Sequence, residues 1–234
     1  MKQLNFTTML ICVTSLIFVP FTAESGSRQV QTGPERWEEE ISAIEHRRES
    51  SSNPTGGLLF VGSSSIRLWK LEESFPGIHT MNCGFGGSQL ADSIHYFERV
   101  VVPSVPKAII VYAGDNDIAE GKSAEIVVRD FSVFCEKTRK QLPAETQLYF
   151  IAIKPSIKRW KLSDEMKKAN DAIRTYAQSH PNIHFVDIWV PMLDSDGKPL
   201  ARLFAEDGLH LSAEGYQVWT KELTACLSRE GLIP

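Results

Sequence analysis

The sequence predicts an α/β fold in which a five-stranded parallel sheet is covered by helices on both faces. Two observations lead to this prediction. Short apolar segments of strand length alternate along the chain with longer segments whose apolar residues recur at helical spacing. Some of the short segments are apolar throughout, which is typical of strands that are buried on both faces of a parallel sheet.

Five segments have the length and composition of strands. Residues 58–61 and 108–112 are continuous apolar runs. The other expected strands are 79–82, 148–153 and 183–186. In parallel sheets, binding and catalytic sites form beyond the C-terminal ends of the strands. The residues that follow each strand are therefore the most informative about function.

Five segments are expected to be helical: 34–50, 88–101, 123–141, a segment that starts at 163 and includes 176, and 212–228. The first contains Pro34, which suits the first turn of a helix. Ser123, Ser163 and Ser212 are expected to cap the last three helices, because a serine hydroxyl can accept a hydrogen bond from a free N–H group in the first turn.

The N-terminal region has the layout of a secretory signal peptide. Lys2 precedes an apolar stretch over residues 9–21, and small residues follow that stretch. We expect cleavage after Ser25, so that residues 1–25 are removed, followed by a linker over 26–33 and a single domain over 34–234. The protein would then be exported to the periplasm or the extracellular space, without stable membrane insertion. An uncleaved membrane anchor is the alternative.

Charge and cysteine content narrow the function further. The formal net charge is −4 at pH 7, which gives no indication of nucleic-acid binding. Beyond the apolar leader the chain has Cys83, Cys135 and Cys226. An odd number of cysteines is not a disulfide framework, so we interpret them as small buried apolar residues and leave one bridge open.

Polar and glycine-rich segments follow the first four expected strands. They read GSSS from Gly62, NCGFGG from Asn82, GDND from Gly114 and KPS from Lys154. A further segment, DGLH from Asp207, precedes the last expected helix. A parallel sheet would gather a serine, a glycine turn, an amide and an Asp/His pair at one edge.

These residue types are the ones that acyl transfer by a serine requires. A serine hydroxyl is a weak nucleophile until a base takes its proton, and the base needs an acidic partner. We interpret His210 as the base and Asp207 as its partner, with the nucleophile among the three serines of residues 63–65. The backbone N–H of the nucleophile and of Gly87, and the side-chain amide of Asn116, would stabilise the oxyanion.

Other interpretations of these segments fit less well. The serine run lacks the lysine of a phosphate-binding loop, and Ile66 replaces the second glycine of a G-x-S-x-G turn. GDND lacks the later glycine and glutamate of an EF-type calcium loop. No second His/Asp/Glu pair with ligand spacing accompanies Asp207 and His210. We therefore expect neither a metal nor another cofactor.

The segments resemble those of the GDSL-type esterases of the SGNH hydrolase superfamily. That family carries Ser, Gly, Asn and His in four separated blocks, and this chain has FVGSSSIRLW, NCGFGG, GDND and DGLH in the same order. The resemblance covers residues 57–228. It implies a flavodoxin-like three-layer α/β/α sandwich and ester hydrolysis without a metal. It selects Ser64 as nucleophile and oxyanion donor, and it assigns the roles given above to the other site residues.

Two positions depart from the family pattern. Ser63 stands where the family usually has aspartate, and Asp115 stands where it usually has a small hydroxyl residue before the Asn. The first change removes an acidic residue beside the site, and the second adds one. Neither removes a catalytic group, but both leave the substrate preference open.

The resemblance and the leader together predict an exported serine esterase that hydrolyses short acyl, above all acetyl, esters of carbohydrates or small molecules. A lysophospholipase or lipid thioesterase is the alternative within enzymes, and a catalytically silent carbohydrate-binding module is the alternative outside them. Trp160 and Lys154 are candidates for substrate binding at the rim of the site. A solvated loop with one packed tryptophan is the other interpretation of that segment.

Overall fold

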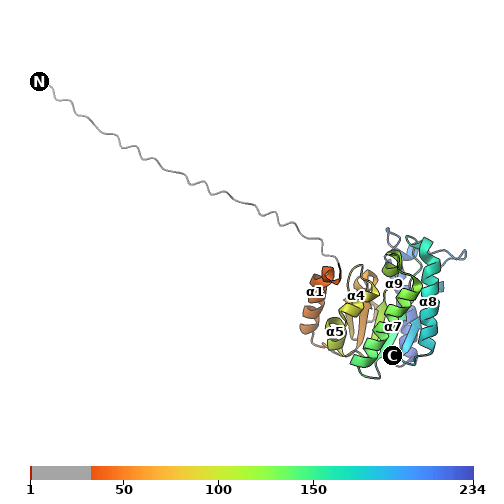
Figure 1. Ribbon diagram of the computed structural model, residues 1–234, viewed down its shortest axis with the longest axis horizontal. Helices are drawn as coiled ribbons and strands as arrows, with labels where there is room; N and C mark the ends of the chain where they lie inside the picture. Colours follow the sequence, from red (N-terminus) through yellow and green to blue (C-terminus); the bar gives the residue numbers. More distant parts are fainter. Residues whose placement is uncertain (2–32) are drawn as a thin grey trace. The chain divides into compact units, whose positions relative to one another are not determined.

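Strands and helices alternate along the chain in the computed structural model, which describes Met1 and residues 33–234 (Figure 1). The predicted signal peptide and linker, apart from Met1 and Gly33, lie outside the described residues. From Gly33 onward the chain packs as one compact unit. Within this described part, no helix combines the length and the apolar character needed to cross a membrane.

The sheet has five parallel strands in the order β2-β1-β3-β4-β5, which confirms the predicted fold. The strands are β1 Leu58–Gly62, β2 Thr80–Gly84, β3 Ala108–Tyr112, β4 Gln147–Ile151 and β5 Ile183–Val186. All residues of the central strands β1 and β3 are buried. The strand order reverses between β1 and β3, and in open parallel sheets the ligand crevice forms at such a point.

Helices cover both faces of the sheet, and each face has its own apolar core. One face is covered by α1 Glu38–Glu49, α4 Leu90–His95, α5 Phe97–Val100, α7 Ala124–Gln141 and α8 Ser163–Gln178. The other face is covered by α2 Ser64–Arg67, α3 Leu71–Ser74 and α9 Ala213–Arg229. Alternate strand residues supply the two cores: Leu59 and Val61 face the first, and Leu58 and Phe60 face the second. Figure 1 shows α7 and α8 running side by side.

Short elements complete the chain. The short helix α6 spans Asp115–Ala119 at the end of β3. The 3-10 helices are η1 Pro34–Trp37, η2 Val102–Ser104, η3 Trp160–Leu162, η4 Val190–Met192 and η5 Ala201–Leu203. Helices of one turn leave no periodic pattern in the sequence, and none of α2, α3 and α6 was expected.

The helix boundaries confirm some predictions and correct others. Ser212 caps α9, because its hydroxyl accepts the N–H of Gly215 at 3.2 Å. Ser123 occupies the N-cap position of α7 but makes no side-chain capping bond, and Glu165 accepts the N–H of Ala124, the first helical residue. The prediction that Ser163 caps α8 is wrong: Ser163 is the first helical residue and continues directly from η3.

The single helix predicted over residues 88–101 is also wrong, because Tyr96 separates α4 from α5. The helix starts later than expected because Gln89 and Asp92 form a capping box. The Tyr96 hydroxyl donates to the carbonyl of Pro34 at 2.8 Å and so ties this break to the N-terminal segment.

The fourth strand ends earlier than predicted, at Ile151. The Asn170 side chain on α8 accepts the N–H of Ile153 at 2.8 Å and donates to its carbonyl at 2.9 Å. Because these backbone groups bond to a side chain, the chain leaves the sheet at this point. It then runs through Lys154 toward the end of β3.

Candidate active site

The turn that carries the predicted nucleophile, residues 62–65, follows directly from β1. Gly62 has φ 138°, and a Cβ at this position would lie 1.9 Å from the carbonyl oxygen of Tyr112, so only glycine fits. Ser63 and Ser65 are each 1% exposed, whereas Ser64 is partly exposed. Of the three serines, only Ser64 presents its side chain where a substrate can reach it.

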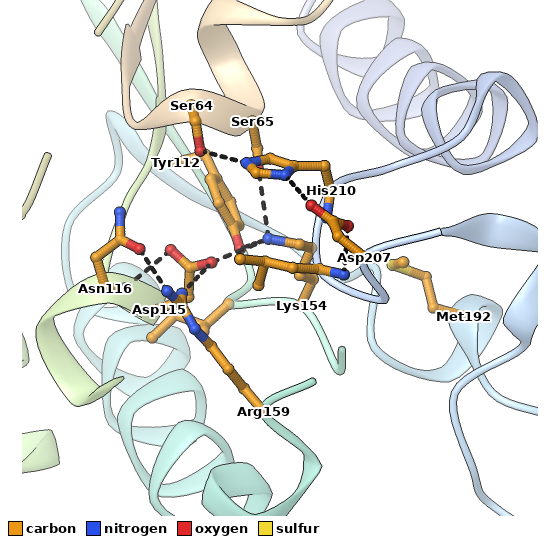
Figure 2. Close-up of polar contacts among 12 residues, drawn as sticks. Ser64, Ser65, Tyr112, Asp115, Asn116, Lys154, Arg159, Met192, Asp207 and His210 are labelled. Carbon is orange, nitrogen blue, oxygen red and sulfur yellow. Dashed lines mark hydrogen bonds and ion pairs between the residues drawn. The ribbon is translucent and has the colours of Figure 1, made fainter. Parts of the chain in front are cut away.

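Ser64, His210 and Asp207 form a hydrogen-bonded chain (Figure 2). Ser64 Oγ lies 3.0 Å from His210 Nε2, and His210 Nδ1 lies 2.5 Å from Asp207 Oδ2. The other carboxylate oxygen of Asp207 accepts the N–H groups of Leu209 and His210, both at 2.9 Å. One aspartate therefore shapes the loop and orients the ring that the loop carries.

The charge on Asp207 determines which ring nitrogen of His210 is free. The N–H of Leu209, followed by the contacts with His210, holds the pKa of this carboxyl well below its usual range. An ionised Asp207 accepts a hydrogen bond from Nδ1–H, which leaves Nε2 to accept the proton of Ser64. This is the arrangement that a serine nucleophile and its general base require.

The two other predicted oxyanion donors lie in neighbouring segments, a loop and a short helix. Asn116 belongs to α6, and its side-chain Nδ2 donates to the carbonyl of Ser88 at 2.9 Å. Gly87, directly before Ser88, has φ 68° and packs against the indole of Trp37, whose Cη2 lies 3.4 Å from the position of a Cβ. The structure thus brings the loop that carries Gly87 next to the start of α6, which carries Asn116.

Lys154 does not lie at the rim of the site, and the prediction that it binds substrate there is wrong. It is 1% exposed, and its ammonium donates to Ser65 Oγ at 3.2 Å, Tyr112 Oη at 2.9 Å and Asp115 Oδ2 at 2.9 Å. Burial lowers the pKa of Lys154, and the nearby charge of Asp115 opposes this shift. These three acceptors allow the charged group to be buried beside the turn of residues 62–65.

Asp115 is buried as well, between two cations. Lys154 Nζ and Arg159 Nη1 each lie 2.9 Å from its Oδ2. Burial alone would raise the pKa of Asp115, but the charges of Lys154 and Arg159 outweigh this, and the pKa is lowered. Asp115 therefore adds no free acidic group to the site, although it replaces the family's small hydroxyl residue.

Arg159 was not identified from the sequence. Its Nη2 donates to Oδ1 of Asn116 at 2.8 Å, beside its ion pair with Asp115 (Figure 2). Its signal in the sequence is its position in the cationic segment 153–161 after the fourth expected strand, a segment that fits either a substrate-binding rim or a solvated loop. The acidic residue at 115 was the indirect hint, because a buried carboxylate needs a cationic partner.

Trp160 and Trp37 lie in different surroundings. Trp160 is partly buried and stacks on Trp189 with ring centroids 6.3 Å apart. Lys198 and Lys167 lie near its ring, at 5.1 and 5.9 Å from the centroid. Trp37, at the end of η1, borders the loop that carries Gly87.

The remaining acidic residues of this edge have structural contacts. Asp117 is fully buried and accepts a hydrogen bond from Lys122 at 2.8 Å and longer ones from the N–H of Leu90.

Across residues 33–234 no group of three or more His, Cys, Asp or Glu side chains is arranged to hold a metal ion. Cys83, Cys135 and Cys226 are all free thiols.

The model of the GDSL-like lipase/acylhydrolase family matches residues 66–218, a segment that includes Asn116 and His210 and begins just after Ser64. No curated protein gives a significant match to the chain.

Solved structures share the fold. A Streptococcus pneumonia protein proposed to be a platelet activating factor has a TM-score of 0.74 and 20% identity, over 82% of this chain and 93% of its own. A GDSL-like lipase from Bacteroides thetaiotaomicron has a TM-score of 0.66 and 19% identity, over 85% and 98%. A carbohydrate esterase family 3 structure from Talaromyces cellulolyticus has a TM-score of 0.57 and 14% identity, over 75% and 97%.

Proposed function

The chain belongs to the GDSL-like lipase/acylhydrolase family, and we propose that it is an exported esterase that removes short acyl groups, above all acetyl, from carbohydrate or small-molecule esters. Family membership makes it a serine hydrolase that acts on ester bonds. The observation that carries the proposed site is the hydrogen-bonded chain from Ser64 through His210 to Asp207.

The first half of the proposed reaction acylates the enzyme. Ser64 Oγ attacks the ester carbonyl carbon while Nε2 of His210 takes its proton, and the ionised Asp207 stabilises the imidazolium. The negative charge on the former carbonyl oxygen is met by the N–H groups of Ser64 and Gly87 and by the amide of Asn116. The intermediate then expels the alcohol, which receives the proton from His210.

The second half releases the acyl group. A water molecule attacks the acyl-enzyme carbonyl while His210 takes one of its protons. The tetrahedral intermediate uses the same oxyanion donors, and its collapse returns that proton to Ser64 Oγ. The products are the carboxylic acid and the alcohol, and the enzyme returns to its starting state without a metal or a redox step.

The preference for a short acyl group is supported by the surroundings of Gly87. The indole of Trp37 packs against this glycine and stacks edge-on against Phe85 at 5.9 Å. We expect this aromatic pair to limit the space for an acyl group bound beside the N–H of Gly87. A carbohydrate ester as substrate gains support from the fold shared with the Talaromyces cellulolyticus carbohydrate esterase.

Export is supported by the leader in the sequence. Residues 9–21 are almost wholly apolar, a lysine precedes them, and small residues follow. Comparing the N-terminus of the mature protein with Gly26 tests the proposed cleavage site.

The decisive experiment measures hydrolysis of p-nitrophenyl acetate by the wild type and Ser64→Ala. We expect turnover by the wild type and a loss of at least about 10⁴-fold in the variant, since removing a nucleophile leaves only the residual contribution of the oxyanion hole and binding. Mass spectrometry after fluorophosphonate labelling should place the label on Ser64. A folded wild type that neither turns over the ester nor takes the label would instead indicate a silent binding module.

An acyl-length series then tests the substrate class. Activity should fall from acetate to butyrate to octanoate, and Trp37→Ala should reduce that fall by opening the space beside Gly87. A preference for octanoate in the wild type would favour the lysophospholipase or lipid thioesterase alternative.

A further inference from the structure

We propose that Arg159 is a positioning residue for catalysis, which acts by fixing the side-chain amide of Asn116 in the orientation that serves the oxyanion. This inference rests on the proposed function, in which Asn116 is an oxyanion donor. Arg159 itself touches neither Ser64 nor His210 through any hydrogen bond or ion pair of the described residues. Its polar contacts are with Asp115 and Asn116.

A side-chain amide can be turned by 180° at little intrinsic cost, and only one of the two orientations is useful here. A donor must face the substrate, so Oδ1 must face away from it. Arg159 Nη2 can only donate, and it lies 2.8 Å from Oδ1 of Asn116. The carbonyl of Ser88 can only accept, and it lies 2.9 Å from Nδ2.

These two partners have opposite requirements, and together they select one orientation. If the amide turned over, Nδ2 would face the guanidinium and Oδ1 would face the Ser88 carbonyl, so both contacts would become repulsive. One hydrogen of Nδ2 is used by Ser88, and the other remains for the oxyanion. In Figure 2 the amide oxygen of Asn116 faces Asp115 and Arg159, and the nitrogen points away from them toward the level of Ser64.

Arg159 is itself held in place, which a positioning residue requires. Its side chain is 17% exposed, and its Nη1 forms an ion pair at 2.9 Å with Asp115, which is also bonded to the buried Lys154. Lys154 in turn donates to Ser65 and Tyr112, which belong to the nucleophile turn and β3. The guanidinium is thus anchored to the same rigid sheet edge that carries the nucleophile.

The carboxylate of Asp115 explains why this chain needs an arginine at position 159. The N–H of Asn116 donates to Asp115 Oδ1 at 3.0 Å, so the carboxylate lies next to the catalytic amide. Because Arg159 pairs with both Asp115 and Asn116, it neutralises the carboxylate and orients the amide with a single planar group. A lysine at 159 could supply the charge but not the fork.

The test compares steady-state hydrolysis of p-nitrophenyl acetate by the full-length wild type, Arg159→Met, Arg159→Lys, Asn116→Ala and the Arg159→Met/Asn116→Ala double variant. Lys158→Met is the matched control, because Lys158 is an exposed neighbour with no side-chain contact in the site. Arg159→Met should lower kcat by roughly 10- to 100-fold with KM changed by less than about twofold, short of the ~10²–10³-fold typical of losing an oxyanion donor outright. Lys158→Met should match the wild type.

The double variant separates positioning from a general structural role. If Arg159 acts through Asn116, the double variant should be no slower than Asn116→Ala, within about twofold. Losses that multiply would overturn the inference, and so would a kcat for Arg159→Met within twofold of wild type. Arg159→Lys keeps a cation beside Asp115 and so preserves the fold. It should still lose kcat severalfold, and wild-type kcat in this variant would also overturn the inference.

A second measurement does not require turnover. It can therefore fail or succeed independently of the proposed esterase activity. In ¹H–¹⁵N spectra the side-chain amide pair of Asn116, identified by its absence in Asn116→Ala, should show one fixed environment in the wild type. In Arg159→Lys and Arg159→Met it should move toward the positions of exposed amides. If the wild type hydrolyses no ester, the proposed function fails while these signals still decide whether Arg159 fixes the amide. Unchanged signals in both variants would refute the positioning role.

Discussion

Ser64 Oγ and His210 Nε2 lie 3.0 Å apart although 146 positions separate the two residues in the chain. The serine is placed by the end of β1, and the histidine by the loop that leads into α9. Tyr216, on the first turns of α9, donates its hydroxyl to the carbonyl of Ser65 at 2.9 Å and so ties the two segments together. Substitutions around this junction therefore test the site directly.

Substitution of Ser63 and of Ser65, the two neighbours of Ser64, should have different effects on stability. Ser63 Oγ is buried without a hydrogen-bond partner, so Ser63→Ala should keep near wild-type kcat and stability. Ser65→Ala removes an acceptor of the buried Lys154 and should lower the free energy of unfolding by about 1 kcal/mol. Ester hydrolysis and urea unfolding measure the two effects. A folded Ser63→Ala variant without activity would argue that the nucleophile has been misassigned.

Asp207→Asn should reduce kcat by at least about 10²-fold, but less than His210→Ala, because the ring loses its charged partner and keeps its role as base. The pKa of Asp207 is lowered, so its carboxylate stays ionised through the mildly acidic range. Activity lost on mild acidification should therefore come from protonation of the base that accepts the Ser64 proton, and not from Asp207.

The pH profile of kcat/KM tests the role of the imidazole as base, because the direction in which its acidic limb moves in Asp207→Asn can be predicted. Without the carboxylate the imidazolium is less stable, so the acidic limb should move to lower pH in Asp207→Asn. An acidic limb that moves to higher pH, or a wild-type profile without such a limb, would count against His210 as the base.

Gly62→Ala should destabilise the protein by roughly 3 kcal/mol or more, because its Cβ would lie 1.9 Å from the Tyr112 carbonyl oxygen. Gly77→Ala is the matched control. Gly77 also has a positive φ, 77°, but no atom lies within 4 Å of the added Cβ. That control should cost about 1 kcal/mol from backbone strain alone. Thermal or urea unfolding of both variants checks the difference, and equal losses would exclude the steric explanation.

The thiols should differ in reactivity. Burial raises the pKa of Cys83 to about 12, and burial also raises the pKa of Cys135. Because the thiolate is the reactive form, both should resist iodoacetamide at pH 8 in the native protein. Cys226 is only partly buried and should react first. Peptide mapping of native and urea-unfolded samples checks this, and early modification of Cys83 would contradict its burial.

Trp160 stays a proposed contact for a sugar substrate. If its ring borders the bound carbohydrate, Trp160→Ala should raise KM for an acetylated sugar severalfold, with a smaller effect on p-nitrophenyl acetate, because stacking on an aromatic face contributes about 0.5–1.5 kcal/mol. Lys198→Met is the control, since this lysine covers the same ring. An unchanged KM on the sugar ester would identify Trp160 as a packing residue.

The regular parts of the fold could be predicted from local pattern. The segment 108–112 coincides with β3, and 58–61 covers all but the last residue of β1, because continuous apolar runs of strand length mark buried parallel strands. The break at Tyr96 and the early end of β4 could not be predicted. Each depends on a hydrogen bond to a distant segment, from Tyr96 to Pro34 and from Asn170 to Ile153.

The residues of the candidate site also fall into those that the sequence could predict and those that it could not. The blocks and their positions indicated Asn116 and His210, because each block follows a strand or precedes the last helix, and the family resemblance then selected Ser64 among the serines of residues 63–65. The role of Lys154 could not be read from its neighbours, since a lysine after a strand has the same local pattern whether it is solvated or buried. Its acceptors on Ser65, Tyr112 and Asp115 lie 39 to 89 positions away in the chain.

The order of the site residues along the chain also has a consequence during synthesis. Ser64 lies in the first third of the chain, while His210 is held by the loop before α9, the last helix. A polypeptide that is still growing, or that crosses a membrane in extended form, carries a serine without its base. Under the proposed export route, esterase activity would therefore first arise after translocation, and esters inside the producing cell would not be exposed to it.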